Sequence, residues 1–254
     1  MASETLFDRD GHRNVLLEDF GGGAAVQSNQ HLIIDGSEAM ILDPGGHKIY
    51  SKVLAETLAQ LRGAELRYLF LSHQDPDIVA AANGWLMTTD AEAWISKLWV
   101  RFVPHFGLDH LVIDRLRPIE DEGMILPIGK SEVWILPAHF LHSCGNFHVY
   151  DPVSKILYTG DLGASLDRDY RVVPDFDAHV PAMEGFHRRY MASNAALRAW
   201  LAMARELDVE IVAPQHGAYF RGKEMVARFY DWLETLEVGI DVMGTSGYRI
   251  PRRP

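Results

Sequence analysis

Three short polar motifs, each placed just after an apolar, strand-like run, constrain the fold more than any other feature of the sequence. They are His73-Gln74-Asp75-Pro76-Asp77, then His142 together with Gly160-Asp161, and finally Pro214-Gln215-His216-Gly217. Between them they offer three imidazoles and three carboxylates. Such a donor set suits two first-row transition ions with open coordination positions, and it leans towards iron. The sequence therefore predicts a fold in which several strand ends meet around a metal centre.

The composition of the 254 residues permits a sizeable core and argues against some partners. The chain is 48% hydrophobic and 23% charged, and its formal net charge is -11. That charge argues against nucleic acid or an anionic membrane as the main partner. The polar residues 1–14 lack the apolar centre of a secretory signal, and no apolar run approaches the ~20 residues of a membrane span. We therefore expect a cytoplasmic protein with no membrane partner.

The cysteine content narrows the metal chemistry. Cys144 is the only cysteine, so the chain can form neither an internal disulfide nor a thiolate metal cluster. Any metal ligands must therefore be histidines and carboxylates.

Hydrophobic patterning predicts strands and helices in alternation. The pattern predicts a hairpin of residues 30–35 and 39–43 around the turn Asp35-Gly36-Ser37. It then predicts an amphipathic helix over residues 48–61, a buried strand over 66–72 and a helix over 78–87. Residues 93–102 fit a strand or a helix. Strand pairs are expected at 124–136, broken at Gly129-Lys130, and at 146–150 with 155–159. A long helix is expected over 183–207, a strand over 209–213 and a closing helix over 222–236.

This order of elements predicts the architecture. Strand pairs mixed with helices favour an α+β protein with two mixed sheets flanked by helices, an αββα sandwich. No repeat, low-complexity tract or linker divides the sequence. We therefore expect one domain over residues 1–254.

The motif after residues 66–72 has two interpretations. While the chain stays extended, positions i, i+2 and i+4 project to one side, so His73, Asp75 and Asp77 can converge on ions. Pro76 keeps Asp75 out of the helical region. Alternatively, Asp75 caps the following helix, with Pro76 at its first position and Asp77 near its positive end. The sequence of this motif alone leaves both open.

The other motifs are weak singly and stronger together. His142 ends a mainly apolar segment that starts at Ile135. Asp161 follows Gly160 at a strand end, where it is placed to bridge two ions but is also a common turn residue. His216 follows the apolar run 210–214. Their joint occurrence, always at a strand end, favours the metal-centre interpretation.

With these motifs in this order, the sequence resembles the metallo-β-lactamase fold superfamily. More closely, it resembles the di-iron domain of flavodiiron proteins and the oxygen-binding di-iron proteins related to them. The resemblance covers about residues 14–232 and includes further segments: Ser28-Asn29, Leu42-Asp43-Pro44-Gly45, Thr159-Gly160-Asp161-Leu162-Gly163 and Arg189-Tyr190. It implies that His73, Asp75 and His142 hold one iron, that Asp77 and His216 hold the other, and that Asp161 bridges them.

The sequence departs from the flavodiiron pattern at two ligand positions. Asp75 stands where those proteins usually have glutamate, and Ile78 stands where they usually have histidine. An apolar side chain cannot ligate, so water or another histidine would have to replace that ligand. His179 is the first candidate, with His148 and His187 behind it, and a structural role is the alternative for all three. His148 and His179 could also hydrogen-bond a ligand held at the centre.

The resemblance also sets expectations for cofactors and partners. Flavodiiron proteins continue into a flavodoxin-like domain that carries FMN, and we expect no FMN domain in this chain. Two ferrous ions supply only two electrons, so full reduction of O₂ needs an external redox protein. We therefore predict a di-iron protein that binds O₂ or NO, either as a sensor with a signalling partner or as an oxidoreductase with an external donor. A homodimer is possible.

Two other functions remain open at this level. The first is a metal-dependent hydrolase of thioesters, lactones or phosphodiesters, in which a metal-bridging hydroxide is the nucleophile. Ile78 argues against it, because the hydrolases normally use histidine there. The second is a non-catalytic relic that uses the fold as an interaction surface. The aspartate-rich donor set favours iron or manganese over zinc, and so favours the di-iron prediction.

Overall fold

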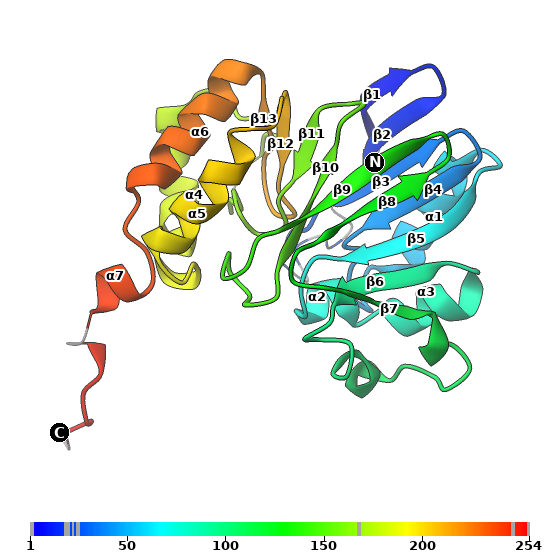
Figure 1. The fold of residues 1–254 in the computed structure, drawn as a ribbon, viewed down its shortest axis with the longest axis horizontal. Helices are drawn as coiled ribbons and strands as arrows, with labels where there is room; N and C mark the ends of the chain where they lie inside the picture. The colour runs from blue at the N-terminus through cyan, green and yellow to red at the C-terminus, as the bar shows by residue number, and fades with distance from the viewer. Residues whose placement is uncertain are drawn as a thin grey trace.

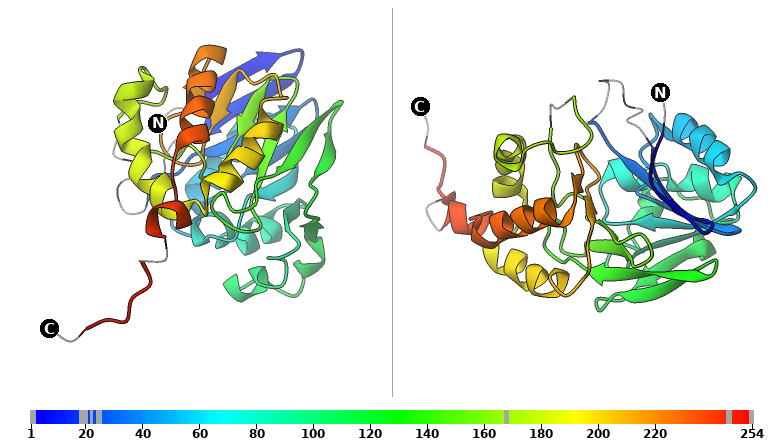
Figure 2. Two further views of the ribbon diagram at one scale, coloured as in Figure 1. Left: turned by 60° about the vertical axis from the view of Figure 1, so that its left-hand side comes forward. Right: turned by 90° about the horizontal axis from the view of Figure 1, so that it is seen from above.

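The computed structural model describes residues 3–17, 21, 23, 26–166, 169–244 and 247–252. Within these residues the strands form two sheets, with strand orders β1-β2-β3-β4-β5-β6-β7 and β13-β12-β11-β10-β9-β8. Figure 1 shows helices α4 to α6 on one side of the molecule and α1 to α3 on the other, and Figure 2 shows the same layers from two more directions. This is the αββα sandwich that the sequence predicts.

The first sheet is antiparallel at its start and parallel afterwards. Its strands are β1 (Glu4–Arg9), β2 (His12–Leu17), β3 (Gln30–Asp35), β4 (Glu38–Leu42), β5 (Glu65–Leu71), β6 (Glu92–Ser96) and β7 (Leu116–Ile119). Strands β1 to β4 pair antiparallel, and β4 to β7 pair parallel. The parallel strands are joined through α1 (Tyr50–Leu61), α2 (Pro76–Val79) and α3 (Ala82–Thr88), and short 3₁₀ turns at Val103–Phe106 and Ile113–Arg115 precede β7. Parallel strands need such crossovers, which cover the outer face of the sheet.

The second sheet is built mainly from hairpins. Its strands are β8 (Met124–Ile128), β9 (Ser131–Pro137), β10 (Phe147–Asp151), β11 (Ile156–Tyr158), β12 (Ile211–Ala213) and β13 (Phe220–Arg221). β12 pairs parallel with β11, and the other pairs are antiparallel. The helices of this half are α4 (Phe176–Tyr190), α5 (Asn194–Ala204), α6 (Lys223–Thr235) and the short α7 (Ile240–Met243).

The two sheets share one apolar layer. Met40 and Phe70 of the first sheet and Ile135 and Phe147 of the second belong to the same buried cluster. Separate clusters lie under α1 to α3 and under α4 to α6. Burial of apolar side chains at about 25 cal/mol per Å² is the main force that holds such layers together. The loops at the strand ends are therefore held on a rigid scaffold.

Most predicted elements are present, and the pairings of residues 30–35 with 39–43, of 124–128 with 131–136 and of 146–150 with 155–159 are confirmed. The segment 93–102 is a strand only as far as Ser96. The predicted helix 78–87 is divided into α2 and α3.

The single helix predicted over 183–207 is wrong. Helix α4 ends at Tyr190, and α5 begins after Ser193, whose extended backbone and side chain cap it by accepting from the Ala196 N–H at 3.3 Å. Helix α4 also starts earlier than predicted, at Phe176, because Asp175 caps it by accepting from the Ala178 N–H at 2.9 Å. Capping hydrogen bonds thus divide an apolar pattern that is continuous in sequence.

The described helices are all too short or too polar to cross a lipid bilayer.

Candidate metal centre

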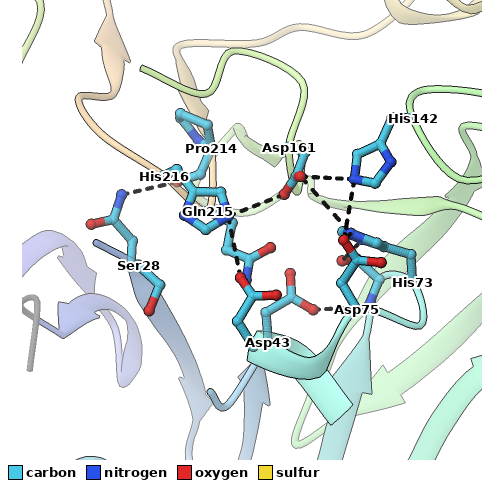
Figure 3. A network of polar contacts seen from close by, with 12 residues as sticks. Ser28, Asp43, His73, Asp75, His142, Asp161, Pro214, Gln215 and His216 are labelled. Carbon is cyan, nitrogen blue, oxygen red and sulfur yellow. Dashed lines mark hydrogen bonds and ion pairs between the residues drawn. The ribbon is translucent and has the colours of Figure 1, made fainter. Parts of the chain in front are cut away.

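The predicted ligands come from both sheets and lie close together. Figure 3 shows five of them facing one another: His73, Asp75, His142, Asp161 and His216. His73 follows β5 of the first sheet, and Asp75 and Asp77 lie in the turn into α2. His142 lies in the loop between β9 and β10 of the second sheet, and Asp161 and His216 follow β11 and β12. Because carboxyl ends of neighbouring parallel strands meet at one edge of a sheet, β11 and β12 bring Asp161 and His216 together.

Asp161 occupies the middle of the site. Its Oδ2 lies 2.9 Å from Nε2 of His142 and 3.9 Å from Nε2 of His73. Its Oδ1 lies 3.4 Å from Nε2 of His216. The ligand atoms of His73, His142 and Asp161 all lie within 4.8 Å of one another. One carboxylate therefore faces two groups of imidazoles, which is the geometry that a bridging ligand needs.

The remaining carboxylates divide between the two groups. Oδ2 of Asp75 lies 3.7 Å from Nε2 of His73 and 3.6 Å from Nε2 of His142. Oδ2 of Asp77 lies 3.4 Å from Nε2 of His216. The structure thus brings all six predicted side chains together, in the division that the family resemblance implies.

The atoms that face the centre suit a cation. Nε2 of His73 and Oδ1 of Asp161 are buried, and neither has a hydrogen-bond partner in the described part of the chain. The other ring nitrogens of two imidazoles are engaged: Nδ1 of His73 lies 3.0 Å from Oγ of Ser72, and Nδ1 of His216 donates to the carbonyl of Gln27 at 2.5 Å. Histidines that ligate metals usually have such a partner at the second nitrogen, which sets the tautomer and the ring orientation. The residues present therefore fit a metal pair.

The electrostatics of the site also favour positive charge. Burial tends to raise the pKa of Asp161, but the facing imidazoles of His142, His216 and His73 hold that pKa well below its usual value. Burial tends to lower the pKa of His216, yet the facing carboxylate of Asp161 raises that pKa to about 9. Without metal, the imidazole of His216 is therefore stabilised as a cation beside Asp161, and metal binding must displace its proton.

Asp75 and Ile78 mark the departures from the flavodiiron pattern. Asp75 stands at the first position before α2, but its side chain makes no capping hydrogen bond and is turned to His73. The capping alternative for this residue is therefore not what the structure shows. Ile78 is fully buried in the apolar cluster under the first sheet, where its side chain contributes to packing.

The three histidines considered as substitutes are buried, with hydrogen bonds directed to other groups. Nδ1 of His179 lies 2.8 Å from the hydroxyl of Tyr170. His148 lies with Nε2 3.3 Å from Nδ2 of Asn146, and burial lowers its pKa to about 3.

His187 uses both ring nitrogens, so it has no free nitrogen for a metal. Its Nδ1 donates to the carbonyl of Met183 at 2.8 Å, and its Nε2 accepts from the Gly163 N–H at 2.9 Å. Because Gly163 is two residues beyond Asp161, this second bond fixes the loop that carries Asp161. The sequence contains no signal for this role.

A second group of supporting residues holds the loop of His216, and the sequence did not reveal its role. The amide of Asn29 donates to the carbonyls of Pro214 at 3.0 Å and Gly217 at 2.9 Å. The side-chain carbonyl of Gln27 accepts from the Gly217 N–H at 2.6 Å. Asn29 belongs to the Ser28-Asn29 segment of the family resemblance, which could have drawn attention to it.

The chain is similar to several known proteins. A family model described as "ODP family beta lactamase" matches residues 26–217. A structure titled "Peroxy diiron species of chemotaxis sensor ODP" has 38% sequence identity and a TM-score of 0.85, over 96% of this chain and 98% of that chain. The apo state of chemotaxis sensor ODP from T. denticola has 37% identity and a TM-score of 0.85, over 95% and 97% of the two chains.

A more distant similarity concerns the fold alone. Rubredoxin oxygen:oxidoreductase from the anaerobe Desulfovibrio gigas has 16% identity and a TM-score of 0.75, and the match covers 91% of this chain but 61% of that one. No curated protein matches the chain.

Proposed function

The chain belongs to the ODP family of beta-lactamase-fold proteins, and on this premise we propose that it is a di-iron protein that binds O₂ and acts as an oxygen sensor. The observation that carries the proposal is the position of Asp161, whose two oxygens face His142 on one side and His216 on the other. Three carboxylates around three imidazoles make a hard, anionic donor set that favours iron over zinc. In this proposal His73, Asp75 and His142 hold one ion, Asp77 and His216 hold the second, and Asp161 bridges them.

When bound, a pair of ferrous ions supplies a reversible two-electron donor with open coordination positions. The chain's own residues hold and shield it. Ser72 and Gln27 orient the rings of His73 and His216 through their Nδ1 atoms. The rings of Phe186 and Tyr190 stack on each other with centroids 4.6 Å apart, and both meet the ring of His142 edge-on. These two aromatic side chains cover one side of the His142 ring.

A sensing role is favoured over a reductase role by the relatives. The relative with 38% identity is a chemotaxis sensor that this chain matches over almost its full length. The D. gigas oxidoreductase is matched over only 61% of its length, and its identity is low. We therefore propose a signalling protein as the partner, with an external redox protein to restore the ferrous state. A cytoplasmic location, a homodimer and a single domain over residues 1–254 are parts of the same proposal, and the apolar layer shared by the two sheets supports the last of these.

Anaerobic reconstitution tests the proposal. The protein is loaded with Fe(II) under argon, its iron content is measured, and O₂ is then admitted. We expect two iron ions per chain and a new visible absorption band on exposure to O₂. A Cys144→Ser variant is the matched control, since Cys144 is exposed and its thiolate could bind stray iron and absorb light. The band must persist in that variant.

Two results would contradict the proposal. One is loaded protein whose spectrum is indifferent to O₂. The other is zinc-loaded protein that turns over thioester, lactone or phosphodiester substrates, which would favour the hydrolase.

A further inference from the structure

His142 differs from the other two imidazoles in how it is oriented. Nδ1 of His73 and Nδ1 of His216 each have a partner, as described above. For His142, the described part of the chain provides no hydrogen bond at Nδ1, while Nε2 faces Asp161. Its side chain is 13% exposed and packs against the aromatic rings of Phe186 and Tyr190, and such ring contacts orient an imidazole less strictly than a hydrogen bond does. The orientation of His142 must therefore come largely from the backbone of its own loop, residues 138–146.

Asn146 closes that loop with three hydrogen bonds. Its carbonyl accepts from the Ala138 N–H at 3.0 Å, and its own N–H donates to the Ser143 carbonyl at 3.3 Å. Its side-chain amide, fully buried, donates to the carbonyl of Leu141, the residue directly before His142. A side chain five residues along the chain thus holds the peptide unit from which His142 projects.

We propose that Asn146 is the positioning residue that orients His142 for metal binding. The inference rests on the proposed metal centre and adds a residue to its support. The same amide nitrogen lies 3.3 Å from Nε2 of His148, which accepts because burial keeps that imidazole neutral. Asn146 therefore uses two N–H donors at once, one for Leu141 and one for His148. Aspartate has no donor at this position, and serine has only one.

The position of Asn146 also connects two ligand loops. A Cβ placed on Gly160 would lie 3.8 Å from Oδ1 of Asn146. Gly160 directly precedes Asp161, so the amide lies between the loop of His142 and the loop of the bridging carboxylate. Loss of the amide is expected to change how these two ligands meet, at the 2.9 Å contact between His142 and Asp161.

The test uses Co²⁺ as a probe, because its visible spectrum reports the ligand geometry. We expect Asn146→Ala to bind Co²⁺ about 10–100-fold more weakly at one of the two ions, as is typical when an outer-shell partner is lost, and to change the Co²⁺ spectrum. Asn14→Ala is the matched control. Asn14 is equally buried and donates two hydrogen bonds, to Asp151 and to Tyr158, neither of which is a ligand. It should lose stability without altering the Co²⁺ affinity or spectrum.

A double-mutant cycle with His142→Ala shows whether Asn146 acts through His142. In the His142→Ala background, Asn146→Ala should cause no further loss of Co²⁺ affinity. Equal losses in both backgrounds would overturn the proposal, and so would a single variant that binds Co²⁺ as the wild type does. Failure of the wild-type protein itself to bind two ions would instead count against the proposed function.

A measurement on the intact protein decides the matter should Asn146→Ala not fold. The side-chain amide resonance of Asn146 should shift when diamagnetic Zn²⁺ binds to the wild-type protein. In His142→Ala the same resonance should not respond to Zn²⁺. An unchanged resonance in the wild type, or an equal shift in both proteins, would overturn the role.

Discussion

Nε2 of His12 in β2 lies 2.7 Å from Oδ2 of Asp151 in β10, so a buried imidazole–carboxylate pair joins the two sheets. Burial tends to lower the pKa of His12, but its hydrogen bonds and charge interactions with Asp151 and Asp35 outweigh burial and raise it above 6.5. Burial tends to raise the pKa of Asp151, but His12 brings it below 3.8. The pair is therefore a source of pH-dependent stability.

The sign of this dependence follows from the two shifts. The raised pKa of His12 gives stability that is fully present below pH 6.5 and is lost as the pH rises through the folded value. The lowered pKa of Asp151 gives stability that is present above pH 3.8 and is lost as the pH falls through its folded value. In metal-free protein, the free energy of unfolding of wild type minus that of His12→Gln should be largest between these limits. Urea denaturation from about pH 3 to about pH 9 checks this, and a difference that stays constant with pH would contradict it.

Asp161→Asn should remove metal binding while the fold remains. The amide keeps the shape of the side chain but loses the negative charge that faces both groups of imidazoles. Elemental analysis after loading with Fe(II) should show a loss of at least one ion per chain. Asp208→Asn is the control, since Asp208 is an exposed carboxylate paired with Lys155 and Lys223. Full iron content in Asp161→Asn would count against the bridging role.

His142→Ala and His216→Ala should each lose a different ion. His142 lies with His73 and Asp75, whereas His216 lies with Asp77. Each variant should retain about one Co²⁺ per chain, and the two Co²⁺ spectra should differ because the remaining ligands differ. Identical spectra, or the same residual ion in both variants, would contradict the division of ligands.

Gly217→Ala should disturb the loop of His216 more than conformational strain alone explains. Gly217 has φ +79°, and a Cβ there would lie 2.2 Å from the carbonyl oxygen of Ser165. Gly36 also has a positive φ, +58°, but a Cβ there meets nothing within 4 Å. We expect Gly36→Ala to cost about 1 kcal/mol and Gly217→Ala to cost roughly 2–4 kcal/mol because the backbone must also move. Urea denaturation of the metal-free variants measures both, and equal losses would show that the close approach does not matter.

Local patterns in the sequence predicted much of the architecture. The hairpins around Gly36 and Gly129 were predictable because a turn residue separates two apolar runs, and both glycines adopt positive φ in the structure. Strand β1 was not predicted, since its side chains are only partly buried and it forms the edge of the sheet. The break between α4 and α5 interrupts an apolar pattern that is continuous in sequence, and its only local sign is Ser193, since serine before a helix is a common cap.

Local sequence patterns also predict only part of the candidate site. Ligand-type residues at strand ends are visible in sequence, and so is the substitution at Ile78. The hydrogen bonds that orient those side chains cannot be predicted from the sequence, because they join residues far apart in the chain. Gln27 and His216 are 189 residues apart, and His187 and Gly163 are 24 apart. Such pairs follow from packing of the whole fold, which no local pattern encodes.

The proposed ligands come from both halves of the sandwich: His73 from the end of β5 and Asp161 from the end of β11. A metal ion bound by both residues would connect the two halves of the sandwich. By thermodynamic reciprocity, whatever draws the halves apart must weaken the hold on iron, and whatever strengthens that hold must draw them together. In the proposed di-iron protein, a change in the oxidation state of the metal that alters its affinity for these ligands would therefore also alter how firmly the two halves are held together. A partner that contacts both halves would respond to that change without contacting the iron.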